Sequence, residues 1–380
     1  MIDAPRNPSK KPAVLITVGT RPEAVKTAPV IRHLREGDWA RVRVLVTAQH
    51  RELLDRVFDF FGIRVDVDLD LMRPEQSLPD LTSRLVPALD AALAAEQPDI
   101  VLAQGDTTTV MATALACFYR RIPFAHIEAG LRTHRKYYPY PEEINRVLAS
   151  HLGDLHFAPT PQARENLLNE GIDAERIVVT GNPVIDALLW AAERDLPAAF
   201  APRGDRRLIL VTAHRRENFG RPLEAICDAL TEIVAAREVE VLYPVHPNPH
   251  VRATVTERLG DHPHVRLVPP LDYAGFVAAM KAAHLILTDS GGVQEEAPSL
   301  GKPVLVLRDE TERPEGLAAG VTRLVGPHRQ RIVSETLKLL DDDAAYRRMA
   351  QATNPYGNGT ASRRIAEALR AFLSKGAGGA

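Results

Sequence analysis

The chain has 380 residues, of which 45% are hydrophobic and 25% charged, a composition typical of a globular protein with two or three domains. Its formal net charge of −2 lacks the basic excess of proteins that coat nucleic acid or anionic lipid, so neither partner is expected. The two cysteines, Cys117 and Cys227, are too few for a disulfide framework or a cysteine-rich metal site. We expect no signal peptide at the N-terminus, and no apolar run approaches the ~18 residues that span a bilayer.

The first half of the chain alternates short β-branched runs with segments of helical periodicity. The expected strands are residues 13–17, 42–47, 100–104, 123–127, 155–158 and 177–180. Apolar residues at helical spacing follow at 24–34, 78–95, 110–119 and 163–168. This alternation predicts an α/β domain with a parallel sheet that is covered by helices on both faces.

The alternation pauses at residues 195–206, where prolines and a glycine cluster with charges, and then resumes. The expected strands of the second half are 208–212, 239–243, 265–268, 285–288 and 304–307, and its expected helices are 223–236, 251–259, 276–283 and 293–300. We therefore predict two Rossmann-like, doubly wound domains, residues 1–182 and 183–360, with a last helix at 361–374 that returns to the first domain. Ligands of such sheets bind at the carboxyl ends of the strands, which predicts a site in the cleft between the domains.

Three turns after strands of the first domain carry candidate residues. Gly19 opens a helix with Arg21 and Lys26 nearby, which suits a phosphate but also describes an ordinary turn with solvated cations. Asp106 is either a helix cap or an acid/base group. Glu128 directly follows an apolar strand, and because a buried carboxylate needs a partner or solvent, we favour a functional role.

Two further segments leave a structural and a functional interpretation open. Glu142 lies in the first turn of a helix expected to begin at Pro141, and its spacing from Arg146 also fits a surface ion pair. His214 follows a strand and precedes two arginines, which suits proton transfer or phosphate contact as well as a structural histidine. His246 repeats that pattern more weakly, and we favour a structural role for it.

The strongest local signal is a serine and two glycines, Ser290, Gly291 and Gly292, between a buried strand and a helix. A hydroxyl and unobstructed backbone N–H groups at a helix N-terminus predict a cradle for a diphosphate. Glu296 is placed to accept hydrogen bonds from ribose, and Arg313 follows a later strand. Since no histidine or cysteine has a partner at metal-ligand spacing, we predict no metal. The ligand expected is a nucleoside diphosphate whose attached group needs acid/base chemistry.

Nine segments of the chain match one family pattern. They are GTRPEAVK at 19–26, TAQHREL at 47–53, GDTTT at 105–109, HIEAGLRT at 126–133, PEEINR at 141–146, HRRENFG at 214–220, YPVH at 243–246, TDSGGVQEEAPSLGKPVLV at 288–306 and NPYG at 354–357. By these motifs the chain resembles the non-hydrolysing UDP-N-acetylglucosamine 2-epimerases of bacteria. The resemblance implies a GT-B-like fold, a cytoplasmic homodimer without a cofactor, and interconversion of UDP-GlcNAc and UDP-ManNAc for cell-surface polysaccharide.

The resemblance also implies roles for individual residues. The acid/base groups would be Asp106, Glu128 and Glu142, with His214 assisting at the departing phosphate. The substrate-binding set would be Arg21, Lys26, Arg146, Phe276 near the uracil, Ser290, Gly291, Gly292, Glu296 and Arg313. A second, regulatory UDP-GlcNAc site would use Gln49, His50 and His246, and this chain has Glu75 where some members have an arginine.

The chemistry that inverts C2 of this sugar has two routes. The missing Gly-x-Gly-x-x-Gly fingerprint argues against transient oxidation by a nicotinamide. The other route breaks the C1–O bond first, so that UDP leaves and a carboxylate removes the C2 proton to give a glycal. The alternatives are a glycosyltransferase of the same architecture, a hydrolysing epimerase that releases free ManNAc, and a sugar-nucleotide sensor without turnover.

Overall fold

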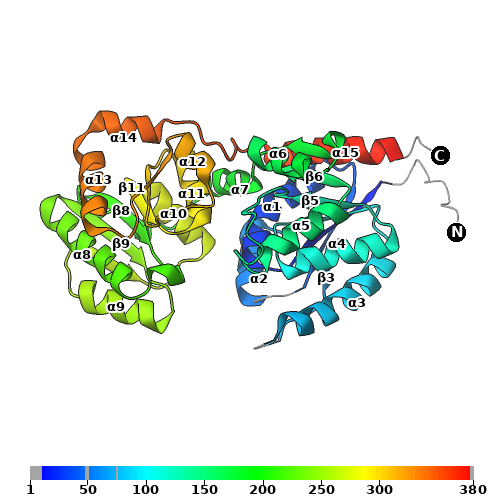
Figure 1. The fold of residues 1–380 in the computed structure, drawn as a ribbon, viewed down its shortest axis with the longest axis horizontal. Helices are drawn as coiled ribbons and strands as arrows, with labels where there is room; N and C mark the ends of the chain where they lie inside the picture. Colours follow the sequence, from blue (N-terminus) through cyan, green and yellow to red (C-terminus); the bar gives the residue numbers. More distant parts are fainter. Residues whose placement is uncertain (1–10, 48–50, 74–75, 377–380) are drawn as a thin grey trace. The chain divides into compact units, whose positions relative to one another are not determined.

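The computed structural model describes residues 11–47, 51–73 and 76–376, which fall into two compact units (Figure 1). Unit 1 combines the chain up to Ala187 with the segment from Gly357 onward, and unit 2 is Leu188–Tyr356. The division lies inside helix α7 (Pro183–Ala192), whereas the boundary expected from the sequence precedes that helix. Along the described stretches of chain, no helix is long and apolar enough to cross a membrane.

Unit 1 is built on a seven-stranded parallel sheet in the order β3-β2-β1-β4-β5-β6-β7. Its strands are β1 (Ala13–Val18), β2 (Arg41–Val46), β3 (Val67–Asp68), β4 (Ile100–Gln104), β5 (Phe124–Ile127), β6 (Leu155–Ala158) and β7 (Ile177–Val179). Its helices are α1 (Arg21–Glu36), α2 (Arg51–Phe61), α3 (Leu78–Glu96), α4 (Thr108–Arg120), α5 (Glu142–Leu152), α6 (Pro161–Asn169), η1 (Ala174–Arg176) and α15 (Ala361–Gly376). The last of these, α15, packs against α1.

The core of unit 1 forms because its central strands are apolar on both faces. Every residue of β1 is buried, as expected for a strand that helices cover on both sides. Leu15 and Val101 from the strands pack with Leu85 of α3 and Val110 of α4. Each such side chain contributes about 1.5–3 kcal/mol when it is fully buried. This packing fixes the ends of β1 and β4, where the candidate residues begin.

Unit 2 has a six-stranded parallel sheet in the order β10-β9-β8-β11-β12-β13. Its strands are β8 (Arg207–Thr212), β9 (Val239–Pro244), β10 (Val265–Val268), β11 (Leu285–Thr288), β12 (Val304–Val306) and β13 (Thr322–Leu324). Its helices, besides the end of α7, are η2 (Ala198–Phe200), η3 (Arg216–Asn218), α8 (Arg221–Ala236), α9 (Pro249–Leu259), α10 (Tyr273–Ala282), α11 (Gly291–Glu296), η4 (Ala297–Leu300), α12 (Pro314–Ala318), α13 (Arg329–Asp341) and α14 (Asp343–Ala350).

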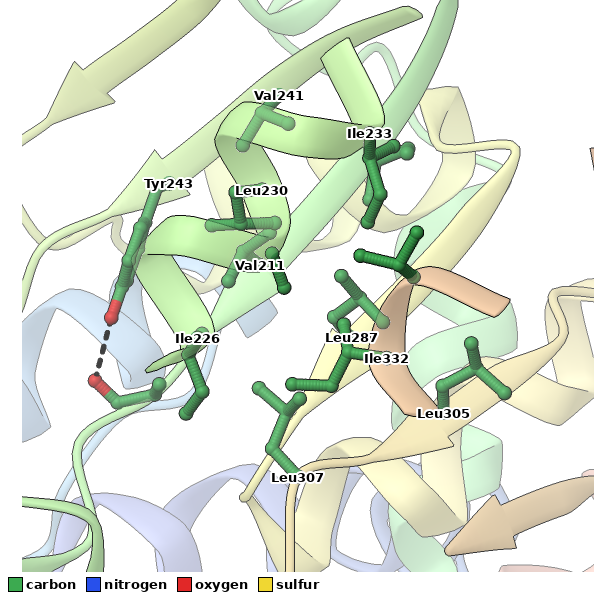
Figure 2. Close-up of a cluster of buried hydrophobic side chains, with 14 of the residues drawn as sticks. Val211, Ile226, Leu230, Ile233, Val241, Tyr243, Leu287, Leu305, Leu307 and Ile332 are labelled. Carbon is green, nitrogen blue, oxygen red and sulfur yellow. Dashed lines mark hydrogen bonds between the residues drawn. The ribbon is translucent and has the colours of Figure 1, made fainter. Parts of the chain in front are cut away.

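The core of unit 2 contains one large polar side chain, Tyr243, among aliphatic residues (Figure 2). Leu230 of α8, Leu287 of β11 and Ile332 of α13 belong to the same buried cluster. The Tyr243 hydroxyl donates a hydrogen bond of 3.0 Å to the carbonyl of Ala213, so its polar atom is satisfied although the ring is buried. Because Ala213 directly follows β8, this bond ties the start of the next segment to the core.

The fold class predicted from the sequence is confirmed, because both sheets are parallel and doubly wound. Strands β4, β6, β10 and β11 have the bounds that were expected. The short strands β3 and β13 were not anticipated, and both lie at an edge of their sheet.

Candidate active site

In each unit some candidate residues follow the strands that flank the point where the strand order reverses, as Asp106 does in unit 1 and His214 in unit 2, whereas Glu128 follows the next strand, β5. That point lies between β1 and β4 in unit 1 and between β8 and β11 in unit 2. Neighbouring loops diverge there, so the carboxyl edge of a doubly wound sheet forms a ligand site at this position. Each unit therefore has candidate residues at the carboxyl edge of its own sheet.

Glu128 is a buried carboxylate with a cation beside it. Its Oε2 lies 2.5 Å from Lys26 Nζ, and it also accepts hydrogen bonds from Gln104 Nε2 at 3.0 Å and Asn182 Nδ2 at 3.1 Å. Its φ of 65° places it in the left-handed region, which a residue other than glycine occupies at a cost. Lys26 is thus the partner that a carboxylate in this position requires, and the functional role of Glu128 stays a prediction.

Asp106 does not cap helix α4, because the cap is the next residue, Thr107, whose hydroxyl accepts from the Val110 N–H at 3.4 Å. The Asp106 carboxylate instead lies 2.5 Å from Arg146 Nη2. Burial raises the pKa of Asp106 and the charge of Glu128 raises it further, whereas Arg146 lowers it. The capping interpretation is therefore wrong, and Asp106 is left as an acid/base candidate.

Of the two interpretations left open for Glu142, the surface ion pair with Arg146 is wrong. Arg146 is buried and binds Asp106, which follows strand β4. A second nitrogen of Arg146 lies 3.5 Å from Glu143. Glu143 accepts hydrogen bonds from the backbone N–H groups of residues 133–134 at 2.8–3.1 Å, so this glutamate has a structural role. Helix α5 begins at Glu142, one residue later than expected, and leaves Glu142 partly exposed.

Glu23 is a buried carboxylate of the first turn to which we had assigned no role. Its side chain accepts hydrogen bonds from the Gly19 N–H at 2.6 Å and the Thr20 hydroxyl at 3.0 Å. Burial raises the pKa of Glu23 to about 7. The Gly19 N–H was expected to be available for a phosphate, but Glu23 occupies it. The signal that could have revealed this is the Thr20-x-x-Glu23 spacing of a capping box.

His214 and Asp289 meet at the reversal point of unit 2, where they follow the neighbouring strands β8 and β11. His214 Nδ1 lies 3.3 Å from Asp289 Oδ1, and the His214 N–H donates to Asp289 Oδ2 at 2.8 Å. Burial lowers the pKa of His214, and Asp289 partly offsets this effect. Asp289 was not among the residues expected at the site, although a carboxylate directly after a buried strand was the available signal.

Two arginines approach the first glycine of the predicted cradle. A Cβ atom built on Gly291 would lie 3.9 Å from Arg215 Nη2 and 3.9 Å from Arg313 Nη2. Arg313 is held by an ion pair with Glu295 of α11. The space beside the Gly291 backbone is therefore positively charged, as a diphosphate requires.

The remaining residues expected at the cradle lie around the same helix start. Ser290 directly precedes α11, and a Cβ atom built on Gly292 would lie 3.9 Å from Ser290 Oγ and 3.7 Å from Glu296 Oε2. The structure thus brings together the serine, the glycines, Glu296 and Arg313. Phe276 lies on α10 and is partly exposed.

The residues expected at a regulatory site are described only in part. Gln49, His50 and Glu75 lie outside the described residues. His246 is exposed, and its ring stacks on that of His214 with centroids 5.6 Å apart and planes 13° apart. No group of three or more metal-ligating side chains is present in the part of the chain that the structure describes.

The two parallel, doubly wound units define a GT-B-like protein. The crystal structure of the glycosyltransferase of kitacinnamycin shares this fold at a TM-score of 0.67 and 13% identity, covering 96% of this chain and 100% of that one. A family model described as UDP-N-acetylglucosamine 2-epimerase matches residues 32–370.

Two closer relatives carry the same description. The UDP-N-acetylglucosamine 2-epimerase of Salmonella typhimurium is 51% identical over 370 residues, 94% of this chain and 98% of the relative. The crystal structure of UDP-GlcNAc 2-epimerase from Neisseria meningitidis bound to UDP-GlcNAc has a TM-score of 0.86 and 45% identity, covering 94% of this chain and 100% of that chain. The chain therefore belongs to the UDP-N-acetylglucosamine 2-epimerase family and is an enzyme.

Proposed function

We propose that the protein interconverts UDP-GlcNAc and UDP-ManNAc by eliminating UDP and adding it back through a glycal. The observation that carries the proposal is the pair of carboxylates, Asp106 and Glu128, each held by its own cation at a strand end of unit 1. The substrate is supported by the Neisseria meningitidis relative, whose structure contains UDP-GlcNAc.

The proposed chemistry begins at C1 because the C2 hydrogen has no adjacent carbonyl to acidify it. The C1–O bond breaks and its electron pair leaves with UDP, so C1 gains oxocarbenium character. A carboxylate then removes the C2 proton and a C1=C2 double bond forms. For the return, a second acid delivers a proton to the opposite face of C2 while a phosphate oxygen of UDP rebonds to C1, so the atoms balance.

The proposed roles follow from charge and placement. Asp106, Glu128 and Glu142 transfer protons, and the raised pKa of Asp106 suits a group that must take up a proton as well as release it. Ser290, Gly291, Gly292 and Arg313 hold the diphosphate and stabilise the charge that develops on it.

The other proposed contacts serve the nucleotide and the leaving phosphate. Arg21, Lys26 and Arg146 add positive charge on the side of unit 1. Glu296 binds ribose, Phe276 lies against the uracil, and His214 assists the departing phosphate oxygen.

The activity is tested by incubating the protein with UDP-GlcNAc alone in D₂O. We expect UDP-ManNAc that carries deuterium at C2, together with exchange of ¹⁸O between bridging and non-bridging positions of the phosphate at C1. Product without deuterium would contradict proton removal, and a retained bridging ¹⁸O would contradict elimination. Release of free ManNAc and UDP would identify a hydrolysing enzyme, and binding without turnover a sensor.

We also propose that the enzyme is a homodimer formed through a surface of α4 and α5. Among the described residues, the large hydrophobic side chains that are exposed all lie between residues 118 and 148. They include Phe118 and Tyr119 at the end of α4 and Ile144 and Leu148 on α5, two helices that pack together. An apolar patch of this kind supports a protein interface, because the exposure of large apolar side chains to water is unfavourable.

A further inference from the structure

We propose that Asp289 is a positioning residue that fixes which ring nitrogen of His214 carries the hydrogen, so that Nε2 is presented to the ligand. The inference rests on the proposed function insofar as His214 acts at the departing phosphate. The hydrogen's position on the ring can nevertheless be measured without any turnover, so the two claims fail separately.

The orientation of the Asp289 carboxylate is fixed by three donors on one of its oxygens. Oδ2 accepts hydrogen bonds from the backbone N–H groups of His214 and Arg215, both at 2.8 Å, and from Asn218 Nδ2 at 2.9 Å. Asn218 also donates to the carbonyl of Leu307 at 3.2 Å, which connects the group to the end of β12. Asp289 is fully buried, so three N–H donors on one oxygen are what a carboxylate there requires.

The second oxygen, Oδ1, faces the imidazole. It lies 3.3 Å from His214 Nδ1 and makes no hydrogen bond within the described residues, so the imidazole is the group placed to satisfy this buried oxygen. Hydrogen bonds of catalytic groups are often long before the ligand binds. The strands that carry the two residues are in register, with Thr212 paired to Thr288 and their hydroxyls 2.6 Å apart. Stacking on His246 restrains the plane of the His214 ring.

These contacts determine the tautomer. An ionised carboxylate has no hydrogen to donate, so Nδ1 must carry the hydrogen, and Nε2 on the far side of the ring is then free to exchange a proton with a ligand. The other charged or titratable groups that face the ring are Arg215 and His246.

An Asp289→Asn variant reverses this arrangement while it preserves the shape. The three N–H donors require the amide oxygen at the Oδ2 position, which places the amide NH₂ at Oδ1 against His214 Nδ1. Two hydrogens cannot face each other, so Nδ1 must become an acceptor and Nε2 must carry the hydrogen. A purely structural role for Asp289 predicts no such change.

The test is ¹⁵N NMR of the imidazole nitrogens in the unliganded full chain, with His214 assigned by the signal lost in His214→Gln. We expect an Nδ1–H tautomer in the wild type and Nε2–H in Asp289→Asn. With UDP-GlcNAc as substrate, kcat of the variant should fall by up to about 10⁴-fold, the effect of the same replacement beside an acid/base histidine that then holds the wrong tautomer. KM should change little. The limb of the kcat–pH profile that reports the pKa of His214 should move to lower pH, because the imidazolium loses the negative charge beside it.

Tyr243→Phe is the control for local loosening, because it removes a hydrogen bond to Ala213 without altering Asp289. It should retain the Nδ1–H tautomer. An Nε2–H tautomer in the wild type would overturn the proposal even if Asp289→Asn failed to fold. A folded Asp289→Asn variant that keeps the wild-type tautomer and the wild-type kcat would overturn it as well. If the wild type shows the Nδ1–H tautomer but forms no UDP-ManNAc, only the proposed function is contradicted.

Discussion

At the scale of single residues, the candidate acid/base groups differ in the cation that each one faces. Glu128 has Lys26 at 2.5 Å together with two amide donors, whereas Asp106 has Arg146 at 2.5 Å. Both carboxylates lie near enough for Glu128 to raise the pKa of Asp106, so protonation of one favours ionisation of the other. Groups coupled in this way are suited to passing a proton in both directions, which a reversible epimerisation requires.

An Asp106→Asn variant tests this assignment. The amide keeps the shape of the side chain but cannot take up a proton, so kcat for UDP-ManNAc formation should fall by ~10²–10⁴. Asp90→Asn is the matched control, because Asp90 on α3 also pairs with an arginine, Arg120. Arg120 is the last residue of α4, whereas Asp106 lies just before the first. The control should keep its kcat, and near-normal turnover of Asp106→Asn would remove this residue from the acid/base set.

Residues at the strand ends could be found from the sequence, but their partners could not. The spacing of Glu142 and Arg146 suggested a pair along one helix, yet Arg146 binds Asp106, which is distant in sequence. A local spacing competes with every long-range contact that the fold creates, and the buried Arg146 guanidinium pairs with the carboxylate that the fold brings to it. Glu23 and Asp289 differ from this case, because each carried a local signal, the Thr20-x-x-Glu23 spacing and a carboxylate directly after a buried strand.

At the scale of elements, hydrophobic runs located the central strands because those strands are buried on both faces. Strand β1 is an example, with all of its residues buried. The edge strands β3 and β13 escaped detection, since a strand with one neighbour can be short and partly polar. Helix ends shifted by a few residues, as for α4, whose cap is a threonine within a run of three.

The pairing of β5 with β6 places two buried histidines opposite each other. His126 and His156 are in register, and His126 Nε2 lies 2.6 Å from the carbonyl of Gly105, next to Asp106. Burial lowers the pKa of His126 to about 4 and that of His156 to about 3, from 6.5. Both rings are therefore neutral in the folded protein across a pH range in which the unfolded chain is protonated.

The sign of the pH dependence follows from this difference. Below pH 6.5 these two histidines bind more protons in the unfolded chain than in the folded protein, so their contribution to the free energy of unfolding should fall as the pH is lowered toward 4. Glu23, whose pKa is raised to about 7, contributes with the opposite sign, so the histidine effect is read as a difference between variants. Each histidine contributes a slope of up to about 1.4 kcal/mol per pH unit. Urea unfolding of the full chain at several pH values should show a shallower slope for His156→Gln than for the wild type. His250→Gln, at an exposed position, should keep the wild-type slope, and equal slopes in all three proteins would contradict the account.

At the scale of the whole molecule, the candidate residues of each sheet gather at its carboxyl edge, at or next to the reversal point. Unit 1 carries carboxylates with paired cations, and unit 2 carries the helix start with Arg215 and Arg313 beside Gly291. The rule for open sheets predicts where such residues gather, because it depends only on strand order. Which of them a ligand contacts depends on side-chain geometry, which spacing in the sequence does not determine.

The proposed homodimer can be broken by charging its surface. Phe118 and Leu148 are 60% and 44% exposed on α4 and α5, and a Phe118→Glu, Leu148→Glu double variant would bury two carboxylates against the partner subunit. We expect sedimentation velocity to give twice the 41.8 kDa chain mass for the wild type and the single mass for the variant. Ala235→Glu, at an exposed position of α8 in unit 2, should remain dimeric. A dimeric double variant would exclude this surface as the interface, and a monomeric wild type would exclude the homodimer.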